Sequence, residues 1–135
     1  MIIVYWSSRS ENTHRFVQKL NIENIRLPIN CTEVIKVSEP FILILPSYGH
    51  TEDTALPLSV KRFLNDDSNC KYLRGVIGCG NTDFGSKYCI AARTVSKMFN
   101  VELLYKLELF GTSVDVENVQ FIIQKQSRKE NGPES

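Results

Sequence analysis

Three loops contain most of the hydroxyl, amide and glycine residues that could bind a ligand. Each loop follows an apolar run that predicts a β-strand. The loops are Ser7-Ser8-Arg9-Ser10-Glu11-Asn12-Thr13, Ser47-Tyr48-Gly49-His50-Thr51-Glu52-Asp53-Thr54 and Gly80-Asn81-Thr82-Asp83-Phe84-Gly85.

The first loop has the composition of an anion site. It places four hydroxyl side chains and one amide between a buried strand and the start of a helix. Free backbone N–H groups and the helix dipole favour an anion at such a position, so the loop could bind a phosphate. Alternatively, Ser10 or Asn12 only caps the helix. Glu11 is compatible with a bound phosphate if its side chain turns outward.

The second and third loops each join a glycine to an aromatic residue, Tyr48 or Phe84. Glycine lets the backbone approach a flat ring, and an aromatic side chain can stack on that ring. The alternative for each aromatic is packing at a strand end. His50 could donate a proton, although a single histidine in a loop is more often a surface residue.

Five segments predict the strands that position these loops. Residues 2–6, 41–45 and 73–79 are apolar runs typical of buried parallel strands. Residues 102–110 alternate, with Leu103, Tyr105, Leu107 and Leu109 on one side, and predict an edge strand. Residues 24–27 are a weaker candidate for the opposite edge.

Helical spacing of apolar residues occurs between the strands. Pro57 suits the first turn of one helix, and residues 66–69 form a polar break after that helix. Residues 28–40 are too few, and too rich in residues that favour strands, to form a crossover helix. The apolar positions are Phe16 and Leu20; Leu56, Val60 and Phe63; Tyr88, Ala92, Val95 and Phe99; and Val116, Val119 and Ile123.

Alternation of strands and helices predicts an α/β fold with a doubly wound five-stranded parallel sheet and helices on both faces. Ligands bind such sheets beyond the carboxyl ends of the strands. We therefore expect the three loops to meet at that edge. The 135 residues fit one domain, predicted over residues 1–127, with a polar disordered tail at 128–135 and fraying from about residue 125.

Charge and cysteine content exclude several classes of protein. Sixteen Lys and Arg against 15 Asp and Glu give a net charge of +1, and the basic residues are scattered, so nucleic acid is not an expected partner. Cys31, Cys70, Cys79 and Cys89 are too widely spaced for a CxxC redox or zinc motif and predict buried or incidental thiols without a metal. The N-terminus resembles neither a signal peptide nor a membrane span, which favours a reducing cytoplasm.

Several motifs in order resemble the NrdI family, the flavodoxin-like activators of class Ib ribonucleotide reductase. They are Ser-Ser-x-Ser-Glu-Asn-Thr at 7–13, Arg-Phe-Leu-Asn-Asp at 62–66, Arg-Gly-Val-Ile at 74–77, Gly-Asn-x-x-Phe-Gly at 80–85 and Leu-Tyr-Lys-Leu-Glu-Leu-Phe-Gly-Thr at 104–112. The resemblance extends from Met1 to about Ile123 and implies a flavodoxin-like fold with bound FMN.

The resemblance also implies roles for particular residues. Those of the first loop would hold the phosphate, those of the other two loops would frame the isoalloxazine, and Ser47 and Gly80 complete the cofactor-binding set. The phosphate residues are Ser7, Ser8, Ser10, Asn12 and Thr13, and the isoalloxazine residues are Tyr48, Gly49, Asn81, Phe84 and Gly85. No catalytic side chain is predicted, because the flavin carries the chemistry.

By the family pattern, the reduced flavin converts oxygen into an oxidant, superoxide, and delivers it to the dimetal site of the small subunit of the reductase. The implied protein is a redox activator rather than an enzyme with its own organic substrate, and it needs a second, unidentified partner that reduces the flavin. Many relatives have a glycine-rich stretch where this chain has His50-Thr51-Glu52-Asp53. The reduction potential of the flavin and the geometry of the path taken by the oxidant are therefore not inferred from the family.

Three other classes fit less well. A general electron-transfer flavodoxin usually has a glycine where this chain has Glu11, is markedly acidic, and does not account for the 104–112 motif. A receiver-type signalling domain requires clustered acids after the first strand, where this chain has serines. A low-molecular-weight phosphatase requires a cysteine nucleophile in that loop, which has none.

Overall fold

The computed structural model describes residues 1–29, 35–47, 56–80 and 89–131. Its centre is a parallel sheet of five strands in the order β2-β1-β3-β4-β5. The strands are β1 (Ile2–Tyr5), β2 (Asn24–Arg26), β3 (Phe41–Pro46), β4 (Leu73–Gly80) and β5 (Leu103–Glu108). All five predicted strands are confirmed, with β2 and β5 at the two edges.

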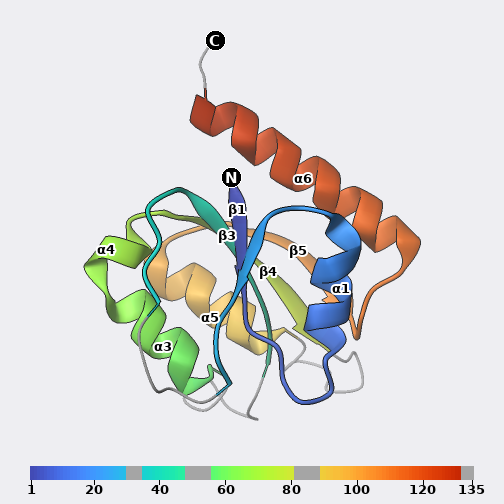
Figure 1. Ribbon diagram of the computed structural model, residues 1–135, viewed down its shortest axis with the longest axis horizontal. Coiled ribbons are helices and arrows are strands. Elements are labelled where there is room, and N and C mark those ends of the chain that lie inside the picture. Colours follow the sequence, from blue (N-terminus) through green and yellow to red (C-terminus); the bar gives the residue numbers. More distant parts are fainter. Residues whose placement is uncertain (30–34, 48–55, 81–88, 132–135) are drawn as a thin grey trace.

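Helices cover both faces of this sheet. Figure 1 shows one layer with α3, α4 and α5 and a second layer with α1 and α6. The helices are α1 (Asn12–Leu20), α3 (Leu58–Asn65), α4 (Asp67–Cys70), α5 (Ile90–Phe99) and α6 (Ser113–Asn131). The prediction of a doubly wound α/β fold is confirmed.

Each face of the sheet has its own apolar cluster. In β1 the even-numbered side chains cluster with α3 and α5, and the odd-numbered ones cluster with α1 and α6; in β3 the parity is reversed. Successive side chains of a strand point to opposite faces, and here both faces are buried. This is why the central strands are unbroken apolar runs in the sequence.

The side chains of β5 do not alternate as the sequence suggested. Val76 pairs with Leu103 while the next residue of β4, Ile77, pairs with Tyr105, so Leu104 is an extra residue at a register shift. Leu103 packs against the cluster of α3 and α5, whereas Leu104, Tyr105 and Leu107 belong with that of α1 and α6. The prediction that Leu103 shares a side with Tyr105 is wrong, because the extra residue reverses the facing.

The polar break after α3 contains a further short helix. Asp66 stands before α4, and its carboxylate accepts a hydrogen bond from the Ser68 amide at 2.9 Å. Aspartate at this position satisfies a free amide of the first turn. Pro57 lies one residue before α3 rather than inside its first turn.

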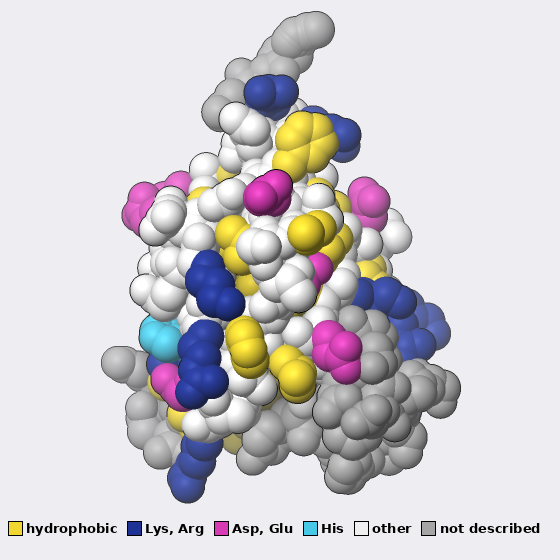
Figure 2. Space-filling view, turned by 90° about the vertical axis from the view of Figure 1, so that its right-hand side faces the viewer, with side chains coloured by type: hydrophobic (Ala, Val, Ile, Leu, Met, Phe, Trp, Pro, Cys, Tyr) yellow, Lys and Arg dark blue, Asp and Glu magenta, His cyan; other side chains and the backbone are white. Residues whose placement is uncertain are grey.

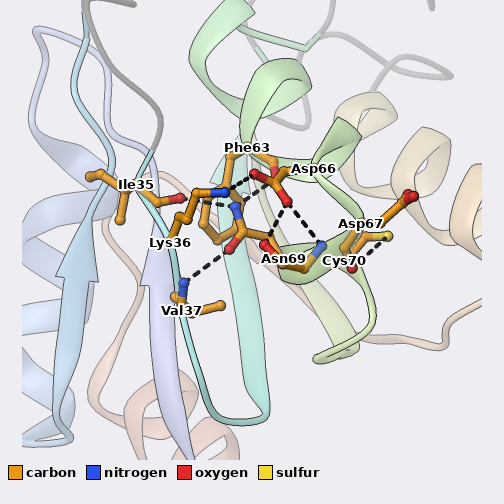
Figure 3. A network of polar contacts seen from close by, with 9 residues as sticks. Ile35, Lys36, Val37, Phe63, Asp66, Asp67, Asn69 and Cys70 are labelled. Carbon is orange, nitrogen blue, oxygen red and sulfur yellow. Dashed lines mark hydrogen bonds and ion pairs between the residues drawn. The ribbon is translucent and has the colours of Figure 1, made fainter.

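A network of polar contacts fixes the connection that leads into β3 (Figure 3). Buried Asn69 donates through Nδ2 to the carbonyls of Ile35, at 2.9 Å, and Phe63, at 3.1 Å, while its Oδ1 accepts from the Val37 amide at 2.9 Å. Residues 27–29 and 35–40 form no helix. The sequence predicted no crossover helix in this connection between β2 and β3. Hydrogen bonds made by the side chain of Asn69 hold part of it instead.

The exposed edge of this network is an ion pair. Lys36 Nζ lies 2.7 Å from the carboxylate of Asp66. The hydrogen bond from Lys36, helped by those from Ser68, lowers the pKa of Asp66 to about 2. Asp66 is therefore charged at neutral pH and joins the connection before β3 to the start of α4.

The C-terminal helix is longer than the sequence suggested. Fraying was expected from residue 125 and a disordered tail from 128, but α6 continues to Asn131. Val119 and Ile123 are buried against the sheet, and Glu130 pairs with Arg74 at 2.7 Å. The ion pair joins the last turns of the helix to the start of β4, and the domain boundary at residue 127 stays a prediction. Residues 132–135 lie outside the described residues.

The surface carries charges of both signs. On the face that includes α1 and α6, Lys and Arg side chains are interspersed with Asp and Glu (Figure 2). Within the described part of the chain, no helix is both long and apolar enough to cross a membrane.

Asn69→Ala tests the network beside β3. The substitution leaves two carbonyls and one amide without the partner that the structure gives them, so we expect a loss of about 3 kcal/mol in the free energy of unfolding, measured with urea. Asn65→Ala is the matched control, since Asn65 is exposed at the end of α3, and it should cost less than about 0.5 kcal/mol. Equal losses would mean that the network contributes no stability of its own.

Candidate functional site

A cavity of about 240 Å³ opens at the carboxyl edge of the sheet. The carboxyl ends of four strands, or the loops directly after them, contribute to it, as expected where such ends meet in a parallel sheet. The lining residues are Ser8, Ser10, Asn12, Thr13, Pro46, Ser47, Cys79, Gly80 and Leu109.

Six of the predicted cofactor-binding residues line this cavity: Ser8, Ser10, Asn12, Thr13, Ser47 and Gly80. Ser7, the first residue of the loop, is fully buried. The five predicted isoalloxazine residues, Tyr48, Gly49, Asn81, Phe84 and Gly85, lie outside the described residues, as do His50, Glu52 and Asp53. Their roles stay predictions.

Ser7 caps helix α1 from inside the protein. Its hydroxyl accepts a hydrogen bond from the His14 amide at 3.1 Å and is fully buried. The residue directly before the helix, Glu11, makes no capping hydrogen bond through its side chain. The capping role considered for Ser10 or Asn12 thus falls to Ser7, which leaves Ser8 and Ser10 at the cavity.

Two amides of α1 remain available at the cavity. Helix geometry gives the first-turn amides of Asn12 and Thr13 no acceptor within the helix. Both residues line the cavity, and beside them the hydroxyls of Ser8 and Ser10 are 2.9 Å apart. Hydroxyl donors next to free helix amides form a site for an anion, since all of these groups can donate hydrogen bonds to its oxygens.

The carboxylate of Glu11 is directed away from this anion site. Arg26 in β2 donates two hydrogen bonds to it, one of 3.1 Å from Nη1 to Oε2 and a shorter one from Nη2 to Oε1. The pairing lowers the pKa of Glu11 and raises that of Arg26. Glu11 does not line the cavity, so the outward orientation that phosphate binding requires is the one found.

Tyr5 fixes the same helix to β1. Its hydroxyl lies 2.6 Å from Nδ1 of His14 in a hydrogen bond. Burial raises the pKa of Tyr5, so the hydroxyl keeps its proton at neutral pH. The hydrogen bond with Tyr5 holds the side chain of His14, and the one with Ser7 holds its backbone amide. Together they fix the first turn of α1.

Ser47 and Gly80 tie neighbouring elements together at the cavity. The hydroxyl of Ser47 accepts a hydrogen bond from the Ala91 amide in the first turn of α5 at 3.0 Å. The carbonyl of Gly80 accepts one from the Leu109 amide, beyond the end of β5, at 2.8 Å. The cavity wall is therefore held by contacts between segments that are distant in sequence.

Cys79 lines the cavity without being reactive. Burial raises the pKa of its thiol to about 12, and a hydrogen bond with Thr13 offsets this only in part. The thiol is protonated at neutral pH and is a poor nucleophile. This confirms the expectation of a buried thiol, which Cys89 also meets.

Unusual backbone conformations gather at this edge of the sheet. Among the described residues other than glycine, five have positive φ: Glu11, Asn21, Cys89, Asn100 and Leu109. The two asparagines end helices, where the left-handed conformation is common. Of the other three, Glu11 directly precedes α1, Cys89 directly precedes α5 and Leu109 follows β5. Residues with strained backbone conformations concentrate at functional sites.

Sequence reasoning missed three residues of the cavity wall. Pro46 and Cys79 are at the carboxyl ends of β3 and β4, and Leu109 follows β5. The rule that ligands lie beyond strand ends would have found the first two. The sequence places Leu109 in the edge strand, on one side with Tyr105 and Leu107, whereas it lies in the turn beyond β5 and is 43% exposed.

The strand order and the cavity at the carboxyl edge define a flavodoxin-like α/β protein in which serine hydroxyls and the start of α1 lie at the first loop. The family model described as "NrdI Flavodoxin like" matches residues 4–121. The chain belongs to the NrdI family. The family and the fold together imply a flavin cofactor, and the hydroxyls and helix amides of the first loop fit the phosphate of a flavin nucleotide.

Relatives called Protein NrdI match most of this chain. That of Mycoplasmopsis pulmonis is 47% identical over 127 residues, covering 92% of this chain and 84% of the relative. That of Yersinia enterocolitica is 50% identical over 120 residues, covering 87% and 90%. That of Wigglesworthia glossinidia brevipalpis is 48% identical over 131 residues, covering 96% and 93%.

Solved flavodoxin structures share the fold. Oxidised flavodoxin 2 from Bacillus cereus superposes with a TM-score of 0.64 at 20% identity, covering 93% of this chain and 98% of that chain. A short-chain flavodoxin associated with a bacterial microcompartment gives a TM-score of 0.66 at 16% identity, covering 94% and 97%. At these identities the likeness shows the fold.

Ser7→Ala separates helix capping from ligand binding. Loss of the cap should lower the free energy of unfolding of flavin-free protein by about 1 kcal/mol, measured with urea. Ser10→Ala is the control, because Ser10 is exposed and its hydroxyl contacts another serine hydroxyl rather than a helix amide; we expect a change below about 0.5 kcal/mol. A larger loss for Ser10→Ala than for Ser7→Ala would contradict the capping assignment.

Proposed function

We propose that this protein binds FMN and uses it to activate the small, dimetal subunit of a class Ib ribonucleotide reductase. The observation that carries the proposal is the anion site of the first loop in a chain that belongs to the NrdI family. Reduced FMN, when bound, would supply the electrons that convert oxygen into superoxide for the dimetal site. A second partner, a protein that reduces the flavin, is part of the proposal.

The choice of FMN over unphosphorylated flavin rests on the first loop. Ser8 and Ser10, which carry hydroxyls, and Asn12 and Thr13, whose amides have no acceptor within α1, line one cavity. A terminal phosphate has enough acceptor oxygens to use several of these donors at once. Because Arg26 holds the Glu11 carboxylate outside the cavity, the nearest negative charge of the loop does not oppose the phosphate.

The protein's own part in the reaction is positioning. Ser7 and Tyr5 fix the first turn of α1, and Ser47 fixes the start of α5 to the loop after β3. A cofactor held by these elements would be presented at the carboxyl edge of the sheet, where a partner can approach it. We propose that the partner docks at this edge, near residues 48–53 and 81–85, so that the oxidant is passed on without dilution in bulk water.

Ser8→Ala and Ser10→Ala test the phosphate site. Each variant should lose about 1.5–3 kcal/mol of FMN binding, or roughly 10- to 150-fold in Kd, because a hydrogen bond to a charged group is removed. Riboflavin binding should change little, since riboflavin lacks the phosphate. Ser38→Ala, at an exposed serine before β3 and so away from the carboxyl edge, is the control. Equal losses for both flavins would place the phosphate elsewhere.

The activation proposal is tested with reduced protein and oxygen. We expect this mixture to activate a class Ib small subunit, read out as metal oxidation and reductase turnover, whereas the subunit with oxygen and no flavoprotein should stay inactive. A generic flavodoxin reduced to the same extent is the control, because it provides a flavin without the proposed docking. Equal activation by that flavodoxin would favour a general electron-transfer role for this protein.

A further inference from the structure

Leu109 has a backbone conformation that its side chain does not favour. It is the second residue of a turn closed by a hydrogen bond from the Gly111 amide to the Glu108 carbonyl at 3.0 Å, and its φ is 55°. Turn positions with positive φ are normally filled by Gly, Asn or Asp, because a larger side chain crowds the backbone there. A leucine at this position is therefore unfavourable for the turn itself.

The folded chain offers this leucine little compensation. The side chain is 43% exposed, and neither apolar cluster formed by the described residues includes it. The other two residues with positive φ at this edge of the sheet make stabilising contacts. Glu11 is paired with Arg26, and Cys89 is buried against Gly78 at the start of α5. Of these three residues with positive φ, Leu109 is thus the one whose apolar side chain stays half-exposed.

Its position points to a ligand rather than to the core. The hydrogen bond from the Leu109 amide to the Gly80 carbonyl, at 2.8 Å, holds the residue against the end of β4. From there Leu109 lines the same cavity as Ser8, Ser10 and Thr13. Serine residues and the first turn of α1 therefore form one part of the cavity wall, and a half-exposed leucine forms another.

We propose that Leu109 is a positioning residue of the flavin site, which packs against the carbon part of the nucleotide that follows the phosphate. The inference rests on the proposed binding of FMN. It explains why an apolar side chain occupies a turn position suited to asparagine: the area left exposed in the free chain is covered when the cofactor is bound. The hydroxyls recognise the phosphate, and Leu109 recognises the part that FMN and riboflavin share.

Leu109→Asn tests this division of roles. Asparagine adopts positive φ more readily and removes the apolar surface, so the variant, free of flavin, should unfold at a urea concentration no lower than the unchanged chain. Its Kd for FMN and its Kd for riboflavin should each rise about tenfold, with their ratio unchanged. This pattern differs from that of Ser8→Ala and Ser10→Ala, which should affect FMN alone.

Phe110→Asn is the matched control. Phe110 is the next residue, is also 43% exposed, and has its ring 4.8 Å from Lys19 Nζ instead of lining the cavity. This variant should leave both Kd values within about twofold of the unchanged chain.

Three results would overturn the inference while leaving FMN binding in place. They are unchanged flavin affinity in Leu109→Asn, equal weakening by Phe110→Asn, and a loss of stability that accompanies the loss of affinity. Unchanged flavin affinity together with weaker binding of the small subunit would assign Leu109 to the partner interface instead. If the unchanged chain binds neither flavin, the proposed function fails first, and this role of Leu109 fails with it.

Discussion

Parallel pairing of all five strands is the constraint on which the rest of the structure depends. It buries both faces of the sheet, which requires a helix layer on each side, and it brings every strand-to-helix loop to one edge. Residues as distant in sequence as Ser8, Ser47 and Leu109 therefore line one cavity. The strand topology, rather than any single side chain, therefore determines where the candidate site lies.

At that edge the start of α1 is prepared for an anion by contacts made elsewhere. Buried Ser7 satisfies the His14 amide, and Arg26 from the neighbouring strand holds the Glu11 carboxylate aside. Two helix amides and two serine hydroxyls remain at the cavity. The acidic Glu11 is therefore compatible with the proposed binding of phosphate at this loop, because Arg26 of β2 pairs with its carboxylate.

The same edge holds the residues whose backbone conformation is least favourable. Glu11, Cys89 and Leu109 have positive φ around the cavity, whereas the two asparagines with positive φ end helices in an ordinary way. Local strain persists where surrounding contacts fix it, as the Ala91 amide on Ser47 and the Leu109 amide on Gly80 do here. The cavity wall is thus held by contacts within the chain itself.

The sequence by itself determined the fold class, the five strands and the serine-rich loop, because apolar periodicity and strand-end chemistry are local properties. It did not determine that β5 shifts register at Leu104, that Glu130 near the end of α6 pairs with Arg74, or that Ser7 rather than Ser10 is the cap. Nor did it place Leu109 at the cavity. The register shift, the ion pair and the place of Leu109 depend on contacts between residues distant in the chain, and the cap depends on how the loop folds back over seven residues; only the tertiary structure decided them.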